Sequence, residues 1–307
     1  MANKKNALIL GGNGFIGSNL GKQLLKENYE VVSFDQVLPE TPIDDIQYIS
    51  GDFFDDVTLR NLVQGKDIIY HAISTINPGN SNQGYMRGYE KDFLQTVKLC
   101  ELLEGAKTKL IFLSSGGTVY GKQSTLPIPE TALPRPINHY GNLKLCIENT
   151  MLTFAYQNGI DVVIARIANP YGPGQDYHKG VGFIDAAIKK AISGEIIEVW
   201  GDGQIVRDYI YIDDVCKALV AIAHQEEYSD KIINISSGKG ISVNQILDII
   251  RDINGTIDVQ YQEARSVDLD KVILDNRKLK IILPGKITDI NSGIEMYYNW
   301  IKHHMNS

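Results

Sequence analysis

The sequence predicts an α/β protein with a doubly wound parallel sheet, followed by a smaller C-terminal α/β lobe. Short β-rich runs alternate with helical patterns over the first two thirds of the chain, which is typical of βαβ units. A glycine-rich turn joins the first predicted strand to the first predicted helix. After Gly172-Pro173-Gly174 the alternation loosens, and this change marks the start of the smaller lobe.

The predicted elements follow one another in order. Strands are expected at residues 7–10, 30–34, 46–50, 67–71, 109–114 and 161–167, and helices at 15–27, 89–103 and 139–156. Residues 110–113 and 162–165 are apolar throughout, as parallel strands buried on both faces should be. Beyond them we expect a helix near 182–193, a strand pair within 196–212, and helices near 213–224, 243–252 and 291–304.

This order divides the chain into two parts. Residues 1–170 form the larger domain, to which 196–224 return, and residues 171–195 and 225–307 form the smaller lobe. We expect the two parts to pack closely, because no Gly/Ser-rich or Pro-rich linker separates them.

Composition excludes several classes of partner. The net charge of -7 argues against nucleic acid and anionic membranes. No apolar run approaches the roughly 20 residues of a membrane span, and the N-terminus lacks the apolar region of a signal peptide. Cys100, Cys146 and Cys216 are far apart and show no metal-ligand spacing, so we expect buried thiols in a reducing, cytoplasmic compartment and no bound metal.

Residues 11–17 predict a Rossmann-type dinucleotide site. Gly11 permits a tight turn, Gly14 lets a pyrophosphate approach the backbone, and Gly17 allows the helix to pack closely on the strand. The amides at the start of the helix, at Phe15 and Ile16, would then face the phosphate. A simple strand–helix turn is the alternative interpretation.

Asp35 supports the dinucleotide interpretation and indicates which cofactor is bound. It ends the second predicted strand, 18 residues after Gly17, where a carboxylate can accept hydrogen bonds from the adenosine ribose. A carboxylate repels the 2′-phosphate of NADP, and residues 36–38 supply no cation, so NAD is favoured. Asp52 either approaches the adenine amino group or merely shapes a turn. The remaining predicted cofactor contacts are Phe53, Ala72, Ser114 and Ile167.

Tyr140 and Lys144 are the predicted catalytic pair. They lie one turn apart on a predicted helix, so their side chains are neighbours. The ammonium and a positively charged nicotinamide both favour the phenolate, which makes Tyr140 a candidate acid/base. A hydroxyl from Ser115 or Thr118, at the end of the fifth strand, is the candidate third group, unless these side chains only cap a loop.

Together these motifs resemble the extended short-chain dehydrogenase/reductase family, and particularly its nucleotide-sugar 4-epimerases. The resemblance spans nearly the whole chain and includes residues 11–17, 114–121, 169–173, 200–203 and 207–215. It implies that the larger domain holds NAD, that the smaller lobe binds a nucleoside-diphosphate sugar, and that two copies form a homodimer through the helices near 89–103 and 139–156.

The resemblance also implies the substrate contacts. Arg207 and Arg265 would bind the diphosphate, Asp268 a ribose hydroxyl, and Asn169 the substrate within the lobe. Val272 stands at a position that gates the sugar 2-substituent, and its small size predicts room for an acetamido group.

The implied reaction is C4 epimerisation of a UDP-hexose through a transient 4-keto sugar. Two departures from the family pattern stand out: Gly116 replaces the usual Ser or Thr, and Asp92 replaces a common Asn. Gly117-Thr118 replaces the Asp-Glu pair of the 4,6-dehydratases, so dehydration is not expected. The alternatives are a reductase of an NDP-4-keto-6-deoxy sugar and a non-catalytic dinucleotide sensor.

Overall fold

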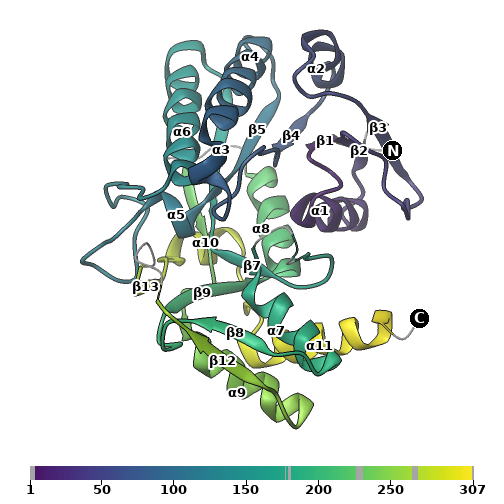
Figure 1. Cartoon of the computed structure of the whole chain (residues 1–307). Coiled ribbons are helices and arrows are strands. Elements are labelled where there is room, and N and C mark those ends of the chain that lie inside the picture. Colours follow the sequence, from purple (N-terminus) through teal and green to yellow (C-terminus); the bar gives the residue numbers. More distant parts are fainter. Residues whose placement is uncertain (1–3, 177, 179–180, 226–230, 265–268, 306–307) are drawn as a thin grey trace.

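Seven parallel strands form the sheet of the larger domain, in the order β10-β6-β5-β4-β1-β2-β3 (Figure 1). The structure is a computed structural model that describes residues 4–176, 178, 181–225, 231–264 and 269–305. The strands are β1 (Asn6–Leu10), β2 (Glu30–Asp35), β3 (Ile46–Ser50), β4 (Ile68–His71), β5 (Lys109–Ser115), β6 (Asp161–Ile167) and β10 (Ile232–Ile235). The order reverses between β1 and β4, and doubly wound sheets bind ligands at such a switch point.

Helices cover both faces of this sheet because alternate strand residues point to opposite faces. Ala7 and Ile9 of β1 belong to one core cluster, with α1 (Phe15–Lys26), α8 (Ile212–His224) and α10 (Arg277–Ile282). Leu8 and Leu10 belong to the other, with α2 (Asp56–Val63), α4 (Leu94–Leu102) and α6 (His139–Asn158). The short helices α3 (Ser81–Arg87) and α5 (Gly116–Val119) and the π-helical segment η1 (Gly88–Phe93) complete the domain.

The predicted fold class is confirmed, and the six predicted strands are confirmed to within one residue at either end. The predicted helix at 89–103 is two elements, η1 and α4, and α6 runs two residues beyond its predicted end. Strand β10 lies outside the sequence prediction. It is only four residues long and carries the buried polar residue Asn234, so its apolar signal is weak.

The smaller lobe combines two small sheets with three helices. In one sheet β9 (Val206–Tyr211) pairs with β7 (Asn169–Tyr171), β11 (Gly240–Ser242) and β13 (Lys271–Val272), and in the other β8 (Ile197–Trp200) pairs with β12 (Val259–Gln262). The helices are α7 (Phe183–Ser193), α9 (Val243–Asn254) and α11 (Ile290–Met305), and a third core cluster joins them to the strands.

The prediction that two strands within 196–212 pair with each other is wrong. Strands β8 and β9 both form, but they belong to different sheets. Gly201 and Gly203 between them have positive φ values of 81° and 74°, and the chain turns there instead of forming a hairpin. In the structure β10 joins the larger sheet, and β8 and β9 lie in the lobe sheets. Residues of α8, and Ile210 of β9, belong to a core cluster of the larger domain. The division into two parts stays a proposal.

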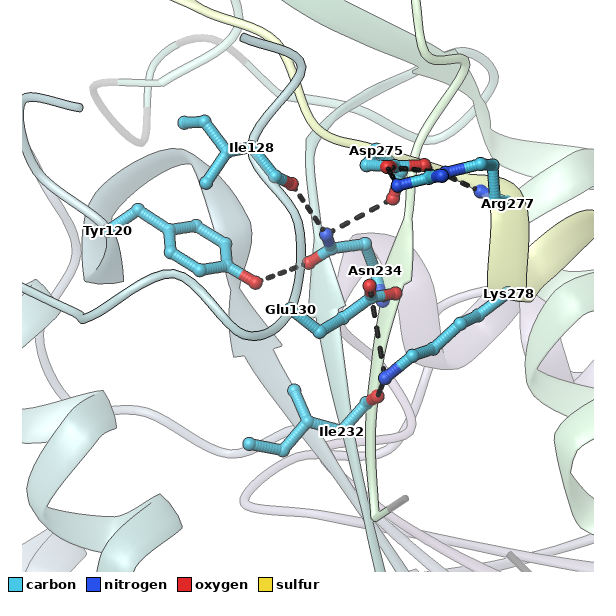
Figure 2. Close-up of polar contacts among 8 residues, drawn as sticks. All are labelled: Tyr120, Ile128, Glu130, Ile232, Asn234, Asp275, Arg277 and Lys278. Atoms are coloured by element: carbon cyan, nitrogen blue, oxygen red, sulfur yellow. Dashed lines mark hydrogen bonds and ion pairs between the residues drawn. The ribbon is translucent and has the colours of Figure 1, made fainter. Parts of the chain in front are cut away.

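Asn234 of β10 joins the loop before α6 to the segment after β13 (Figure 2). Its amide nitrogen donates to the carbonyls of Ile128 and Asp275, both at 3.1 Å, and its oxygen accepts from the Tyr120 hydroxyl at 2.7 Å. Its backbone NH donates to Glu130 at 3.1 Å. The side chain is fully buried and well satisfied, so it fixes both segments on the sheet edge.

Asp208 of β9 is a second buried polar junction. One carboxylate oxygen accepts from the Ser237 NH and hydroxyl, and the other accepts from the NH groups of Gly238 and Leu274. Burial raises the pKa of Asp208 to about 6, while these donors oppose the rise. The carboxylate therefore ties three separate chain segments together.

Among the described residues, no helix is long and apolar enough to cross a membrane, and no group of His, Cys, Asp and Glu side chains suited to a metal ion occurs. Cys100 and Cys216 are buried free thiols, and Cys146 is half-buried.

Replacing Asp208 with Asn should lower the free energy of unfolding by about 3 kcal/mol, because an amide NH2 would face buried NH donors and leave them unpaired. Urea denaturation followed by circular dichroism measures the change. The exposed Asp258→Asn variant is the matched control and should stay within about 0.5 kcal/mol of the unsubstituted protein. Equal stabilities of the two variants would contradict the junction role.

Candidate active site

The glycine turn after β1 brings the start of α1 close to the sheet. Gly11 has φ 90°, and its NH and that of Gly12 donate to the carbonyl of Phe34 at 2.9 and 3.0 Å. A Cβ on Gly17 would lie 2.2 Å from the Gly11 carbonyl oxygen, so only glycine permits this helix–strand distance. The first amides of α1, at Phe15, Ile16 and Gly17, have no partner within the helix and are suited to an anion.

Asp35 is held where the sequence predicts a ribose contact. One of its oxygens accepts from the NH of Asn13 in the glycine turn at 2.9 Å, and the other accepts from the NH of Gln36 at 2.8 Å. Each oxygen keeps a second lone pair for a ligand hydroxyl. The carboxylate therefore both braces the glycine turn and faces the ligand space beside it.

A cavity of about 430 Å³ opens beside the glycine turn, within the size range of small-molecule sites. Five predicted cofactor residues line it: Gly11, Gly14, Asp35, Phe53 and Ala72. Further lining residues that the sequence analysis missed are Asn13, Phe34, Gln36, Val37, Phe54, Ile73, Ser74, Thr75 and Arg87. A glycine turn, a carboxylate, free helix amides and a cavity of this size fit a dinucleotide such as NAD.

Arg87 had no signal in the sequence, because α3 reaches the cavity only through tertiary packing. Residues 73–75, by contrast, come shortly after β4, and the rule that ligands bind at strand ends could have found them.

Other predicted cofactor residues lie outside the cavity lining. Asp52 is exposed and accepts from the Phe54 NH at 2.9 Å, which is the geometry of a simple turn. Ser114 is buried and donates to Glu148, and Ile167 is buried at the end of β6. Phe15 and Ile16 pack their side chains against the core and offer only their backbone.

The predicted catalytic pair, Tyr140 and Lys144, lies on the first turns of α6, at the carboxyl end of β5. Asn138 caps the helix by accepting from the Gly141 NH at 2.8 Å. The Lys144 ammonium is buried, donates to the Leu113 carbonyl at 3.2 Å and lies 5.7 Å from the centroid of the Tyr140 ring. The structure thus brings together the two side chains that the sequence paired.

The surroundings of the pair shift the pKa values of both side chains. Burial and the nearby Asp92 carboxylate raise the pKa of Tyr140 to about 12, and burial lowers the pKa of Lys144 to about 8. Lys144 donates to a carbonyl, and burial and Asp92 both favour the neutral phenol of Tyr140. A further positive charge beside Tyr140, such as that of a nicotinamide, would favour the phenolate.

A buried ion pair joins α6 to strand β6 of the sheet. Both oxygens of Glu148 accept from Arg166 of β6, with a shortest distance of 2.6 Å, and Glu148 also accepts from Ser114. The Arg166 guanidinium lies 4.7 Å from the Tyr120 ring. Because Glu148 is one turn beyond Lys144, this pair fixes the catalytic part of the helix.

The packing around α5 explains why residue 116 is glycine. A Cβ on Gly116 would lie 2.3 Å from Leu274 Cδ1, so the buried Leu274 side chain fills the space that a serine would need. The Thr118 hydroxyl is buried and has no partner among the described residues. A Cβ on Gly141 would lie 2.6 Å from the Thr118 carbonyl oxygen, so Thr118 touches the α6 turn that carries Tyr140. Ser115 is half-buried at the end of β5.

The predicted substrate residues are placed only in part. Asn169 donates to the Asp208 carbonyl at 2.8 Å, and Arg207 of β9 donates to the Leu269 carbonyl at 2.6 Å. Val272 is buried in the core cluster of the larger domain, so its role as a gate stays a prediction. Arg265 and Asp268 lie outside the described residues.

Comparison with known proteins points to one family. The model of the NAD dependent epimerase/dehydratase family matches residues 7–236. The chain is 29% identical to a putative UDP-glucose 4-epimerase of Methanocaldococcus jannaschii, over 96% of this chain and 98% of that protein. It is 30% identical to the dTDP-4-dehydro-6-deoxyglucose reductase of Escherichia coli, over 96% of each. The solved UDP-glucose 4-epimerase of Thermotoga maritima, with UDP-glucose, has a TM-score of 0.90 at 28% identity and covers 98% of this chain and 99% of that one.

Two glycine substitutions separate the roles within the turn. Gly17→Ala should lower the melting temperature by about 5 °C or more and weaken NAD binding at least about tenfold, because its Cβ meets backbone. Gly14→Ala should leave the melting temperature within about 2 °C, since its Cβ meets only the Gly11 oxygen at 3.2 Å, yet the methyl group should hinder the pyrophosphate. Calorimetric titration with NAD and thermal melts measure both. Unimpaired NAD binding by both variants would place the dinucleotide elsewhere.

Proposed function

The chain belongs to the NAD-dependent epimerase/dehydratase family, as its motifs indicate, and from this premise we propose that it interconverts C4 stereoisomers of a UDP-hexose. The observation that carries the proposal is the Tyr140–Lys144 pair at the carboxyl end of β5, next to β4, whose following residues line the dinucleotide cavity. The substrate class is UDP-glucose/UDP-galactose or their N-acetyl forms.

In the proposed reaction Tyr140 is the acid/base. Its phenolate takes the proton of the sugar 4-hydroxyl and later returns it, so the residue ends as it began. Bound NAD supplies the hydride acceptor at sugar C4 and the donor for its return to the opposite face. Lys144 is already held by Leu113 and keeps a positive charge one turn from Tyr140.

We assign the third catalytic group to Thr118. Gly116 has no side chain, and Leu274 occupies the space beside it. Thr118 contacts the Tyr140 turn, and its buried hydroxyl has no partner in the described structure, which supports a role for it beside Tyr140. Ser115 stays the second choice.

We also infer that two copies associate through α4 and α6. Leu99 faces the sheet and is fully buried, whereas Leu94 of α4 is 54% exposed and Tyr156 of α6 is 91% exposed. These apolar side chains support a helix-to-helix contact between copies.

A second candidate is reduction of a 4-keto-6-deoxy sugar. The 30% identity to the E. coli reductase favours it, because the same tyrosine and lysine would serve that reaction. A reductase consumes NADH in proportion to product, whereas an epimerase uses no net reductant.

The decisive test is incubation of the protein with a panel of UDP- and dTDP-sugars, with products identified by NMR. We expect a C4 stereoisomer of UDP-glucose or UDP-N-acetylglucosamine without net NADH consumption. Tyr140→Phe should lower the rate by about 10²- to 10⁴-fold, since the acid/base is lost. Stoichiometric NADH consumption with a 4-keto sugar, and no epimer, would replace the first function with the second.

The assignment of the third group predicts different effects of two substitutions. Thr118→Val preserves shape but removes the hydroxyl, and we expect kcat to fall about tenfold or more with little change in KM. Ser115→Ala should lower kcat less than about threefold. The reverse order would transfer the role to Ser115.

A further inference from the structure

Asp92 is a buried carboxylate that the proposed reaction does not use. It lies in η1 and is 1% exposed. One oxygen accepts from the Thr75 NH at 2.7 Å and the Ser74 hydroxyl at 3.0 Å. The other oxygen is buried and has no partner among the described residues. A half-satisfied carboxylate in a protein interior is costly, so its presence calls for a physical reason.

The backbone of η1, which carries Asp92, packs closely against α6. Gly88 allows the approach, because a Cβ there would lie 2.7 Å from Leu143 Cδ2 and 2.8 Å from Ile76 Cδ1. Leu143 directly precedes Lys144 on α6. A π-helical segment is rare and often occurs at a functional site, and here it carries Asp92.

Asp92 also holds one wall of the dinucleotide cavity. Its two hydrogen-bond partners, Ser74 and Thr75, belong to the segment after β4 that lines the cavity. The Asp92 carbonyl accepts from Thr96 at 2.7 Å, and Thr96 is bonded to the His71 ring at 2.9 Å. The residue thus links the cofactor wall to the strand beneath it.

The titratable groups around the catalytic pair come from four elements. Asp92 of η1 acts on both Tyr140 and Lys144, and Glu148 of α6 acts on Lys144. Glu148 is neutralised by Arg166 of β6. His71 of β4 is uncharged at neutral pH, because burial and Lys144 lower its pKa to about 3. Of the two carboxylates named here, Asp92 is thus the one without an ion-pair partner in the described chain.

We propose that Asp92 is a positioning residue: its carboxylate is the buried counter-ion that keeps Lys144 protonated and holds the 74–75 segment against the cofactor. The pH-rate part of this inference rests on the proposed function, while its spectroscopic part does not.

The carboxylate changes the fraction of Lys144 that is charged at neutral pH. Burial lowers the pKa of Lys144 to about 8 even with Asp92 present, so about 90% of the side chain is charged at pH 7. A carboxylate close by shifts such a pKa by about one unit or more, so without it about half of Lys144 would be neutral. The same charge raises the pKa of Tyr140, so Asp92 keeps the ammonium charged while it makes the phenolate harder to form.

The test is Asp92→Asn, whose amide oxygen can still accept from the Thr75 NH. Removal of the negative charge lowers the pKa of both catalytic groups. In the NAD-loaded enzyme, the acid limb of the kcat/KM profile reports Tyr140 losing its proton, and the alkaline limb reports Lys144 losing its charge. We expect both limbs to move to lower pH by about one unit. If the rate falls equally at every pH and neither limb of the profile moves, the proposal is overturned, and Asp92 has only a structural role.

A readout independent of turnover separates this inference from the proposed function. The chain has 16 tyrosines, so the Tyr140 titration is taken as the phenolate absorbance difference between each NAD-loaded protein and its Tyr140→Phe counterpart. The midpoint should fall in Asp92→Asn and also in the second neutral variant, Asp92→Ser. The surface variant Asp248→Asn removes an exposed carboxylate of α9 and should leave the midpoint unchanged. If no sugar is epimerised, this titration still decides the inference, and an unchanged midpoint in both Asp92 variants would overturn it.

Discussion

The attachment of α6 to the end of β5 is the constraint on which the site depends. Lys144 donates to the Leu113 carbonyl, and one turn later Glu148 accepts from Ser114 and forms a two-pronged ion pair with Arg166. Breaking a buried ion pair by removing one partner costs about 3–5 kcal/mol, so the helix has one well-defined position. Because Tyr140 lies on the first turn of the same helix, its position near the carboxyl end of β5 follows from these contacts.

Close backbone approach at three glycines builds the rest of the site. Gly17 lets α1 meet the β1 turn, Gly88 lets η1 meet α6, and Gly116 admits the Leu274 side chain beside α5. In each case a Cβ would come within 3 Å of its neighbour. At residue 116, where the resemblance implies a Ser or Thr, the Leu274 side chain fills the space beside the glycine, and the nearby Thr118 hydroxyl is buried without a partner among the described residues.

Two buried polar side chains connect the larger domain to the lobe strands. Asn234 holds the carbonyls of Ile128 and Asp275, and Asp208 holds the NH groups of the 237–238 turn and of Leu274. Both side chains form hydrogen bonds to backbone groups, and these bonds fix the orientation of the bound segments more closely than apolar packing does. They help to hold the four-residue strand β10 in the larger sheet, although the strand that follows it, β11, belongs to a lobe sheet.

The sequence by itself determined the parallel α/β fold, the glycine turn, Asp35 and the pairing of Tyr140 with Lys144, because each depends on local periodicity or spacing. Tertiary structure alone decided the partners of β8 and β9, the place of β10, the cavity position of Arg87, and the contact between Gly116 and Leu274. It also decided the direction of the pKa shifts at Tyr140 and Lys144, since burial and the Asp92 charge act through space. These features depend on residues far apart in the chain, and no local pattern encodes how such residues meet.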